Sequence, residues 1–283
     1  MLDRHPIGLC WGTIHQADLE QTIELAARYG FPTLQIPPDI VLEHGDAAAI
    51  HRRLRDAGVQ IRLIDAITAG IPGMRTEPVV FRGRTMPRYD AAACLEVANA
   101  LEVPLVNISH YLGSPVSLEQ MAEGVASVCR MAAMHGVTIV LEFVPDSGIR
   151  TMSEAAQIAL ASGEANCKVH LDTWHLARTG GSAETIRQLS PGLIGAFQIS
   201  DRKEPAPGSA YIPMSGRLLP GEGELPLTEI VAAALANNPD LTIEVEVFSE
   251  ELGAMAPDDA AKRVADAVAD WRAGVIVLIA TES

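Results

Sequence analysis

The chain has 283 residues, of which 48% are hydrophobic and 20% charged, the profile of a globular protein with a sizeable core. Its formal net charge of −15 argues against a nucleic-acid partner, because such partners are held mainly by cations. No apolar run approaches the roughly 20 residues that span a bilayer, and the N-terminal segment lacks the pattern of a secretory signal. We therefore expect a cytoplasmic protein with no membrane partner, whose four scattered cysteines are buried as small hydrophobic residues.

Short β-branched runs alternate with longer helical patterns along the whole chain. The predicted strands are Ile7–Trp11, Thr33–Ile36, Gln60–Asp65, Leu105–Ser109, Thr138–Glu142, Lys168–Asp172, Leu193–Gln198 and Thr242–Phe248. The predicted helices are Leu19–Tyr29, Ala47–Ala57, Tyr89–Leu101, Leu118–Met134, Ser153–Ala161, Ala183–Leu189, Leu227–Ala236 and Asp258–Trp271. Gly30, Gly58 and Gly136 follow predicted helices directly, where a left-handed residue is expected to close the helix.

Eight strand-then-helix units without a break in composition predict an α/β fold, a single (β/α)₈ TIM barrel that forms one domain over residues 1–283. The alternative is an open, doubly wound parallel sheet. That fold would place a glycine-rich phosphate loop after the first strand, and the segment Trp11-Gly12-Thr13-Ile14-His15 is not one. The closed barrel is therefore preferred.

Two of the connections that follow strands are unusually long. One runs from Ala66 to Arg88 and the other from Ser200 to Pro226. Both lie on the face where barrel enzymes carry their active sites, and long loops of this kind are often lids or binding loops. The first contains four arginines, which could bind an anion but which we expect to decorate a lid: Arg75, Arg82, Arg84 and Arg88.

Four side chains that can bind a metal stand at the ends of four successive strands. Glu142, Asp172 and Gln198 each end a predicted strand, and Glu246 lies near the end of the last one. Each alone would be read as a charge on the rim or a helix cap, but strand ends of a barrel converge. A divalent cation would remove the repulsion among three carboxylates, and oxygen ligands suit Mn²⁺ or Mg²⁺ first, with Co²⁺ or Zn²⁺ as alternatives.

Three further residues are close to these ligands in the sequence. Glu244 shares a strand face with Glu246, which we prefer as the ligand because it is nearer the rim, and Glu244 is expected to be buried beside it. His170 precedes Asp172 by two residues and is expected to be a hydrogen-bonded interior residue. His175 lies in the loop after Asp172, either as a surface residue or as part of the site.

The motifs between Glu142 and Ser249 resemble those of the sugar phosphate isomerases and epimerases, within the xylose isomerase-like TIM barrel superfamily. They are Leu141-Glu142-Phe143, His170-Leu171-Asp172-Thr173-Trp174-His175, Phe197-Gln198-Ile199-Ser200-Asp201, Arg217-x-x-Pro220-Gly221-Glu222-Gly223-Glu224 and Glu246-Val247-Phe248-Ser249. The resemblance implies that Glu142, Asp172, Gln198 and Glu246 bind one divalent metal ion. The family often has His at the third position, and bacterial 3-dehydroshikimate dehydratases resemble this chain in having Gln there.

The resemblance implies a metal-dependent isomerase or epimerase acting on a keto-sugar, a cyclitol or a related polyhydroxy carbonyl compound by proton transfer through an enediolate. Glu142 and Glu246 would be the acid and base, and His175 would transfer a proton or hold a substrate oxygen. Arg217 would bind a substrate carboxylate or phosphate, or would be a surface residue that ties its loop down.

Three other functions are weighed against this one. A dehydratase of the 3-dehydroshikimate type is the alternative enzyme, and a non-catalytic metal-binding barrel is the alternative outside enzymes. A DNA endonuclease of this fold would need a His-rich zinc cluster and a basic surface, which eight His and a net charge of −15 do not supply. Such barrels are often homodimers or homotetramers, and no residue decides between these states.

Overall fold

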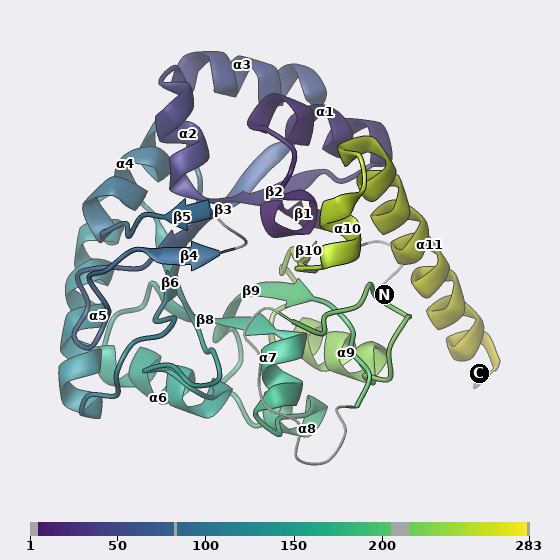
Figure 1. Cartoon of the computed structure of the whole chain (residues 1–283). Coiled ribbons are helices and arrows are strands. Elements are labelled where there is room, and N and C mark those ends of the chain that lie inside the picture. The colour runs from purple at the N-terminus through teal and green to yellow at the C-terminus, as the bar shows by residue number, and fades with distance from the viewer. Residues whose placement is uncertain (1–4, 82–83, 205–214, 282–283) are drawn as a thin grey trace.

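A computed structural model of the chain describes residues 5–81, 84–204 and 215–281. Eight parallel strands close into a barrel in the order β1-β10-β9-β8-β7-β6-β3-β2, and an outer ring of helices surrounds them (Figure 1). The barrel strands are β1 (Ile7–Cys10), β2 (Thr33–Ile36), β3 (Gln60–Ile67), β6 (Leu105–Ser109), β7 (Thr138–Glu142), β8 (Cys167–Asp172), β9 (Ile194–Ile199) and β10 (Ile243–Val245). The predicted (β/α)₈ fold is confirmed, and the single domain over residues 1–283 stays a prediction.

The helices cover the outside of the barrel and fill several of its connections. They are the 3₁₀ helix η2 (Trp11–Ile14) and the α-helices α1 (Leu19–Tyr29), α2 (Pro38–His44), α3 (Ala47–Ala57), α4 (Ala91–Ala100), α5 (Leu118–Ala133), α6 (Met152–Ser162), α7 (Thr173–Arg178), α8 (Ala183–Arg187), α9 (Leu227–Asn237), α10 (Glu250–Ala254) and α11 (Pro257–Thr281). Gly30, Gly58 and Gly136 have φ of 78°, 69° and 68°, so the predicted left-handed closures are confirmed. Within the described residues, no helix is both long and apolar enough to span a membrane.

The sequence interpretation missed the short elements. It did not predict η2, α2, α7 or α10, each of at most seven residues, nor the antiparallel pair β4 (Val79–Phe81) and β5 (Arg84–Met86). This pair lies in the first long connection, the one expected to be a lid. Arg82 and residues 205–214 of the second connection lie outside the described residues.

The last strand is shorter than predicted. It ends at Val245 rather than at Phe248, because the chain then turns to Thr13 of η2. The Thr13 hydroxyl donates to the carbonyl of Val245 and accepts from the amide of Val247, both at 3.0 Å. Glu246 therefore lies one residue beyond the strand, at the carboxyl-terminal mouth of the barrel.

The barrel interior changes from apolar to polar along the strands. Strands β3, β7 and β9 contribute a small buried apolar cluster of Leu63, Val140 and Ala196. These strands alternate around the barrel, as expected for one interior layer. Because side chains alternate between the two faces of a strand, the next inward positions of the same three strands are Asp65, Glu142 and Gln198. On these three strands the inward side chains thus change from apolar to polar towards the mouth.

Candidate active site

The barrel mouth contains a small cavity of about 130 Å³. Asp65, Glu142 and Glu246 contribute carboxylates to its lining, while Trp11 and Phe248 form an aromatic wall. The two aromatic rings meet edge to face, with their centroids 5.9 Å apart. Its mixture of apolar walls and a few polar groups is typical of sites that bind small molecules.

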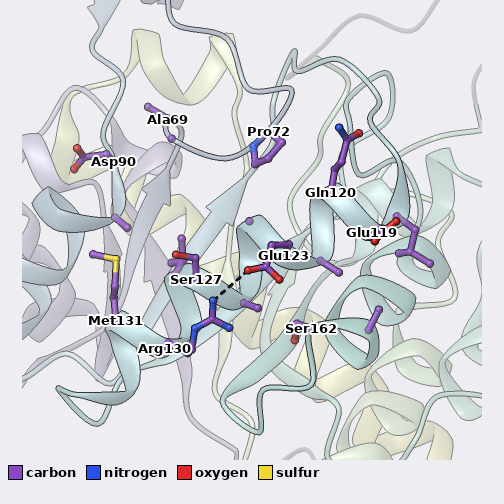
Figure 2. A pocket seen from close by; sticks show the side chains of 18 of the residues that line it. Ala69, Pro72, Asp90, Glu119, Gln120, Glu123, Ser127, Arg130, Met131 and Ser162 are labelled. Carbon is purple, nitrogen blue, oxygen red and sulfur yellow. Dashed lines mark hydrogen bonds and ion pairs between the residues drawn. The ribbon is translucent and has the colours of Figure 1, made fainter.

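A larger concavity of about 1310 Å³ lies on the outer surface, along α5 and its neighbours (Figure 2). Its charged side chains include Glu123 and Arg130, which pair with each other at 3.4 Å. The two candidate metal-binding groups found among the described residues lie at the barrel mouth instead. The smaller cavity is therefore the candidate active site.

Glu142 and His175 form a buried pair. The Nε2 of His175 lies 3.4 Å from Oε1 of Glu142. Burial opposes the charge of Glu142, but the hydrogen bond and charge of His175 outweigh it and lower the pKa of Glu142 to about 2. His175 belongs to helix α7 and is only 6% exposed, so its expected position in a loop is wrong, as is its alternative as a surface residue.

Asp172 fixes the start of helix α7. Its Oδ1 accepts hydrogen bonds from the backbone amides of Trp174 and His175, at 2.6 and 2.9 Å. An N-cap of this kind satisfies amides that have no partner within the helix. Asp172 therefore orients His175 towards Glu142, and its second oxygen is left for another partner.

That partner is Arg217, whose guanidinium lies between two carboxylates. Its Nη1 is 2.7 Å from Oδ2 of Asp172 and 2.9 Å from Oε2 of Glu246. Trp174 and Phe248 cover the guanidinium, with ring centroids 5.3 and 5.7 Å from its central carbon. Burial disfavours the charged form, but Asp172 and Glu246 outweigh burial and raise the pKa of Arg217. Arg217 is 4% exposed, so the alternative of a surface arginine is wrong.

The amide of Gln198 is held by two other side chains. Its Nε2 donates to Oε1 of Glu246 and to Oε1 of Gln35, both at 2.8 Å. Its own Oε1 is buried and has no hydrogen-bond partner among the described residues. Burial raises the pKa of Glu246 well above its usual range, despite the opposing charge of Arg217. The Oε1 of Gln198 accepts no hydrogen bond from the described part of the chain and belongs to a side chain that contacts a buried carboxylate, so it is suited to binding a cation.

Three residues at this mouth were not singled out from the sequence. Asn107 donates through Nδ2 to Asp65 at 2.7 Å and to Glu142 at 3.1 Å, and the thiol of Cys10 donates to Glu246 at 3.1 Å. Burial, followed by the charge of Glu142, raises the pKa of Asp65 to about 7. The signal that could have found them is their inward position near the ends of β1, β3 and β6. All four cysteines are buried, as predicted.

His170 differs from its expectation. It is fully buried on β8, one layer below Asp172, but neither ring nitrogen has a hydrogen-bond partner among the described residues. Burial lowers its pKa, although the charges of Glu142 and Asp172 oppose this. His170 is therefore an interior residue, and the predicted hydrogen bonding is wrong.

Glu244 lies inside the barrel below Glu246. It is fully buried and accepts hydrogen bonds from Oγ1 of Thr33 at 3.2 Å and from Nε2 of Gln35 at 3.1 Å. Burial raises the pKa of Glu244 to about 7, although these hydrogen bonds favour the charged form. Gln35 thus links Glu244 to Gln198.

The raised pKa of Glu244 predicts a pH dependence of stability. The folded protein keeps the proton up to about pH 7, whereas an unfolded glutamate releases it near pH 4.3. The folded state therefore binds more protons between these values, and this group's contribution to the free energy of unfolding falls as pH rises through them. Glu244→Gln has no such group to titrate. Its free energy of unfolding should therefore rise relative to that of the wild type by up to about 3 kcal/mol between pH 4.5 and 8.

Urea denaturation of both metal-free proteins across this pH range measures the difference. The other carboxylates are common to both proteins, and their contributions cancel in the subtraction. A difference that stays constant with pH would show that Glu244 titrates alike in the folded and unfolded states.

Among the described residues, two groups of metal-capable side chains are close enough to share an ion. Glu142, Asp172 and His175 form the first, and Cys10, Asp65 and Glu246 form the second, with ligand atoms within 4.8 Å of one another in each. Three of the four predicted ligands are therefore divided between the groups, and the fourth, Gln198, contacts Glu246 of the second group. Arg217 bridges the two groups, since it contacts Asp172 of one and Glu246 of the other.

A closed (β/α)₈ barrel with ionisable side chains gathered around a cavity at its carboxyl-terminal mouth defines a barrel enzyme. The sequence model of the xylose isomerase-like TIM barrel family matches residues 23–272. The chain belongs to this family, as its motifs predicted.

Two characterised relatives are similar over most of the chain. The inosose isomerase of Bacillus velezensis is 23% identical over 257 residues, which cover 84% of this chain and 86% of that protein. The D-psicose 3-epimerase of Agrobacterium fabrum is 24% identical over 264 residues, which cover 83% and 81%. Both are sugar or cyclitol isomerases or epimerases by name.

Solved structures share the fold at lower identity. The IOLI protein, described with a bound zinc atom, superposes with a TM-score of 0.77 at 18% identity, over 94% of this chain and 97% of its own. The probable 3-DHS dehydratase AsbF from Bacillus anthracis superposes with a TM-score of 0.71 at 15% identity, over 93% and 98%. These similarities establish the architecture.

Proposed function

We propose that this protein is a divalent-metal-dependent isomerase or epimerase that acts on a keto-sugar, a cyclitol or a related polyhydroxy carbonyl compound. The observation that carries the proposal is the gathering of buried metal-capable side chains at the barrel mouth. Glu142, Asp172 and His175 offer ligand atoms within 4.8 Å of one another, and Arg217 links Asp172 to Glu246, which Gln198 contacts. The names of the inosose isomerase and D-psicose 3-epimerase relatives support the same reaction class.

The residues at the mouth fit a divalent cation. The mouth brings together the buried carboxyl groups of Glu142, Asp172 and Glu246 and the half-buried one of Asp65. Arg217 is the cation that pairs with two of them. The raised pKa values of Asp65 and Glu246 show that the negative charges of these two residues are poorly stabilised within the cluster. Gln198 offers an oxygen with no donor. We therefore propose Glu142, Asp172, Gln198 and Glu246 as the ligands.

The donor set favours Mn²⁺ or Mg²⁺, because the four proposed ligands are all oxygen atoms. Zn²⁺ or Co²⁺ remains the alternative, since the imidazole of His175 and the thiol of Cys10 lie beside the ligands. When bound, such an ion polarises a substrate carbonyl and makes the neighbouring proton more acidic.

The chain's own residues would then orient the substrate and move that proton. Glu142 and Glu246 stand at different strand ends of the mouth, so one can accept a proton from the carbon next to the carbonyl and the other can return it. His175, held by Asp172 and within hydrogen-bond range of Glu142, can pass a proton or hold a substrate oxygen. Trp11 and Phe248 would exclude water from one side of the cavity.

A dehydratase is the second candidate, on the specific observation of Gln198 in the place of the family's frequent His. The similar fold of a probable 3-DHS dehydratase is consistent with it. Dehydration begins with the same proton removal and differs in expelling a hydroxyl from the next carbon. The site geometry serves both outcomes, so the product must separate them.

Mass spectrometry after incubation in D₂O tests the proposal. The protein is loaded with Mn²⁺ or Mg²⁺ and given a panel of ketoses, inososes and 3-dehydroshikimate. We expect one deuterium next to the carbonyl, with formation of an isomer or epimer, from at least one ketose or inosose. Loss of water from 3-dehydroshikimate alone would establish the dehydratase, and metal-loaded protein that neither exchanges nor converts any compound would contradict both reactions.

A further inference from the structure

We propose that Arg88 forms an anion-binding subsite at the edge of the active-site cavity, so that the substrate is an anionic polyhydroxy carbonyl compound with a carboxylate or phosphate. This inference rests on the proposed function and adds the charge of the substrate to it. It also changes the interpretation of this arginine, which the sequence suggested was decoration on a lid.

Arg88 contributes to the lining of the same cavity as Glu142 and Glu246. Its Nε donates to the backbone carbonyl of Glu77 at 3.1 Å, which holds the guanidinium in place. Its Nη2 is buried and finds no acceptor among the described residues. A buried cationic donor without an acceptor is costly to keep, and a ligand oxygen would satisfy it.

Arg217 does not supply this function, although the sequence made it the first candidate for binding an anion. Both Asp172 and Glu246 lie within ion-pair distance of its Nη1, at 2.7 and 2.9 Å. Its charge is thus balanced inside the protein. Of the two arginines that line the cavity, only Arg88 has no carboxylate within ion-pair distance among the described residues.

The surroundings of Arg88 favour an anion. Burial and the neighbouring charge of Arg75 lower the pKa of Arg88, while Tyr111, which also lines the cavity, and the charge of Glu77 oppose this. A guanidinium keeps its proton under these conditions, so an incoming anion would relieve the repulsion from Arg75. In a chain with a net charge of −15, an anionic substrate needs a local positive charge at the cavity, and Arg88 supplies one.

The position of Arg88 separates the two ends of a ligand. Glu142 and Glu246 are buried at the mouth of the barrel, whereas Arg88 belongs to the connection after β3 and is only partly buried. A substrate whose carbonyl meets the carboxylates would extend its far end towards Arg88. A carboxylate and a phosphate are both suited to a guanidinium fork, and binding experiments can separate them.

Isothermal titration with matched compounds tests the subsite without relying on turnover. Fructose 6-phosphate is compared with fructose, and 3-dehydroshikimate with its methyl ester, using metal-loaded wild type, Arg88→Gln and Arg88→Lys. We expect wild type to bind the anionic member of one pair about tenfold tighter or more than its neutral partner. Arg88→Gln should lose this ratio while binding the neutral compound as before, and Arg88→Lys should keep part of it.

Arg187→Gln is the matched control, because Arg187 is an exposed arginine paired with Glu184 on α8. It should keep the wild-type ratio. Equal binding of both members of each pair by wild type, no binding of either anion, or an unchanged ratio in Arg88→Gln would each overturn the subsite. Anion binding through Arg88 with no conversion of any compound would instead contradict the proposed function and leave the subsite standing. The preferred pair tells a phosphate from a carboxylate.

Discussion

Replacing Asp172 by asparagine is expected to remove the bound metal and to lower kcat/KM by about three orders of magnitude or more, as expected when a polarising ion is lost from a site. The substitution keeps an oxygen that can cap helix α7 through the amides of Trp174 and His175. It removes the negative charge that faces Arg217 and the proposed ion. Metal content by mass spectrometry and steady-state kinetics measure the two effects.

Asp18→Asn supplies the matched control for Asp172→Asn. Asp18 is the N-cap of α1 and accepts from the amide of Gln21 at 2.8 Å, so the chemical change is the same at an exposed helix start. We expect it to change stability by less than about 1 kcal/mol and to leave metal content and kcat/KM as in wild type. Full metal content in Asp172→Asn would exclude Asp172 as a necessary ligand.

Replacing Arg217 by methionine is expected to destabilise the metal-free protein by about 3–5 kcal/mol, because it leaves two buried carboxylates without their cation. The carboxylates of Asp172 and Glu246, both almost fully buried, would then face each other. A divalent cation at the same mouth would restore part of this loss, so added Mn²⁺ should stabilise Arg217→Met more than it stabilises wild type. Chemical denaturation with and without Mn²⁺ gives both values.

Arg187→Met, at an exposed ion pair, should change the free energy of unfolding by no more than about 0.5 kcal/mol. If Arg217→Met were as mild as this control, the ion pairs of Arg217 would contribute little to folding. If Mn²⁺ stabilised the variant and the wild type equally, the ion and the guanidinium would not act on the same carboxylates.

Local sequence patterns were sufficient to predict the barrel and to place the candidate ligands near the ends of its strands. β-branched runs alternate with helical ones, and alternation along each strand places Glu142 and Gln198 inward above Val140 and Ala196. The motif around Asp172 fixed its position at a strand end. These features depend on residues two to four positions apart, and this is the spacing at which a periodic sequence pattern reveals a strand or a helix.

Contacts between distant parts of the chain could not be predicted in the same way. Arg217 lies 45 residues from Asp172 and 29 from Glu246, and nothing in its own segment shows that it would lie between them. The turn after Val245 depends on Thr13, more than 200 residues away. The position of His175 in a helix follows from a cap, and the short α7 has too few turns to show a helical period.

Anomalous diffraction from crystals soaked in Mn²⁺ tests the metal site most directly. The account predicts one strong peak per chain, within bonding distance of Glu142, Asp172, Gln198 and Glu246, with Arg217 displaced from at least one of its two carboxylates. A peak held only by Cys10, Asp65 and Glu246, or no peak in fully soaked crystals, would contradict the proposed ligand set and the metal-dependent mechanism built on it.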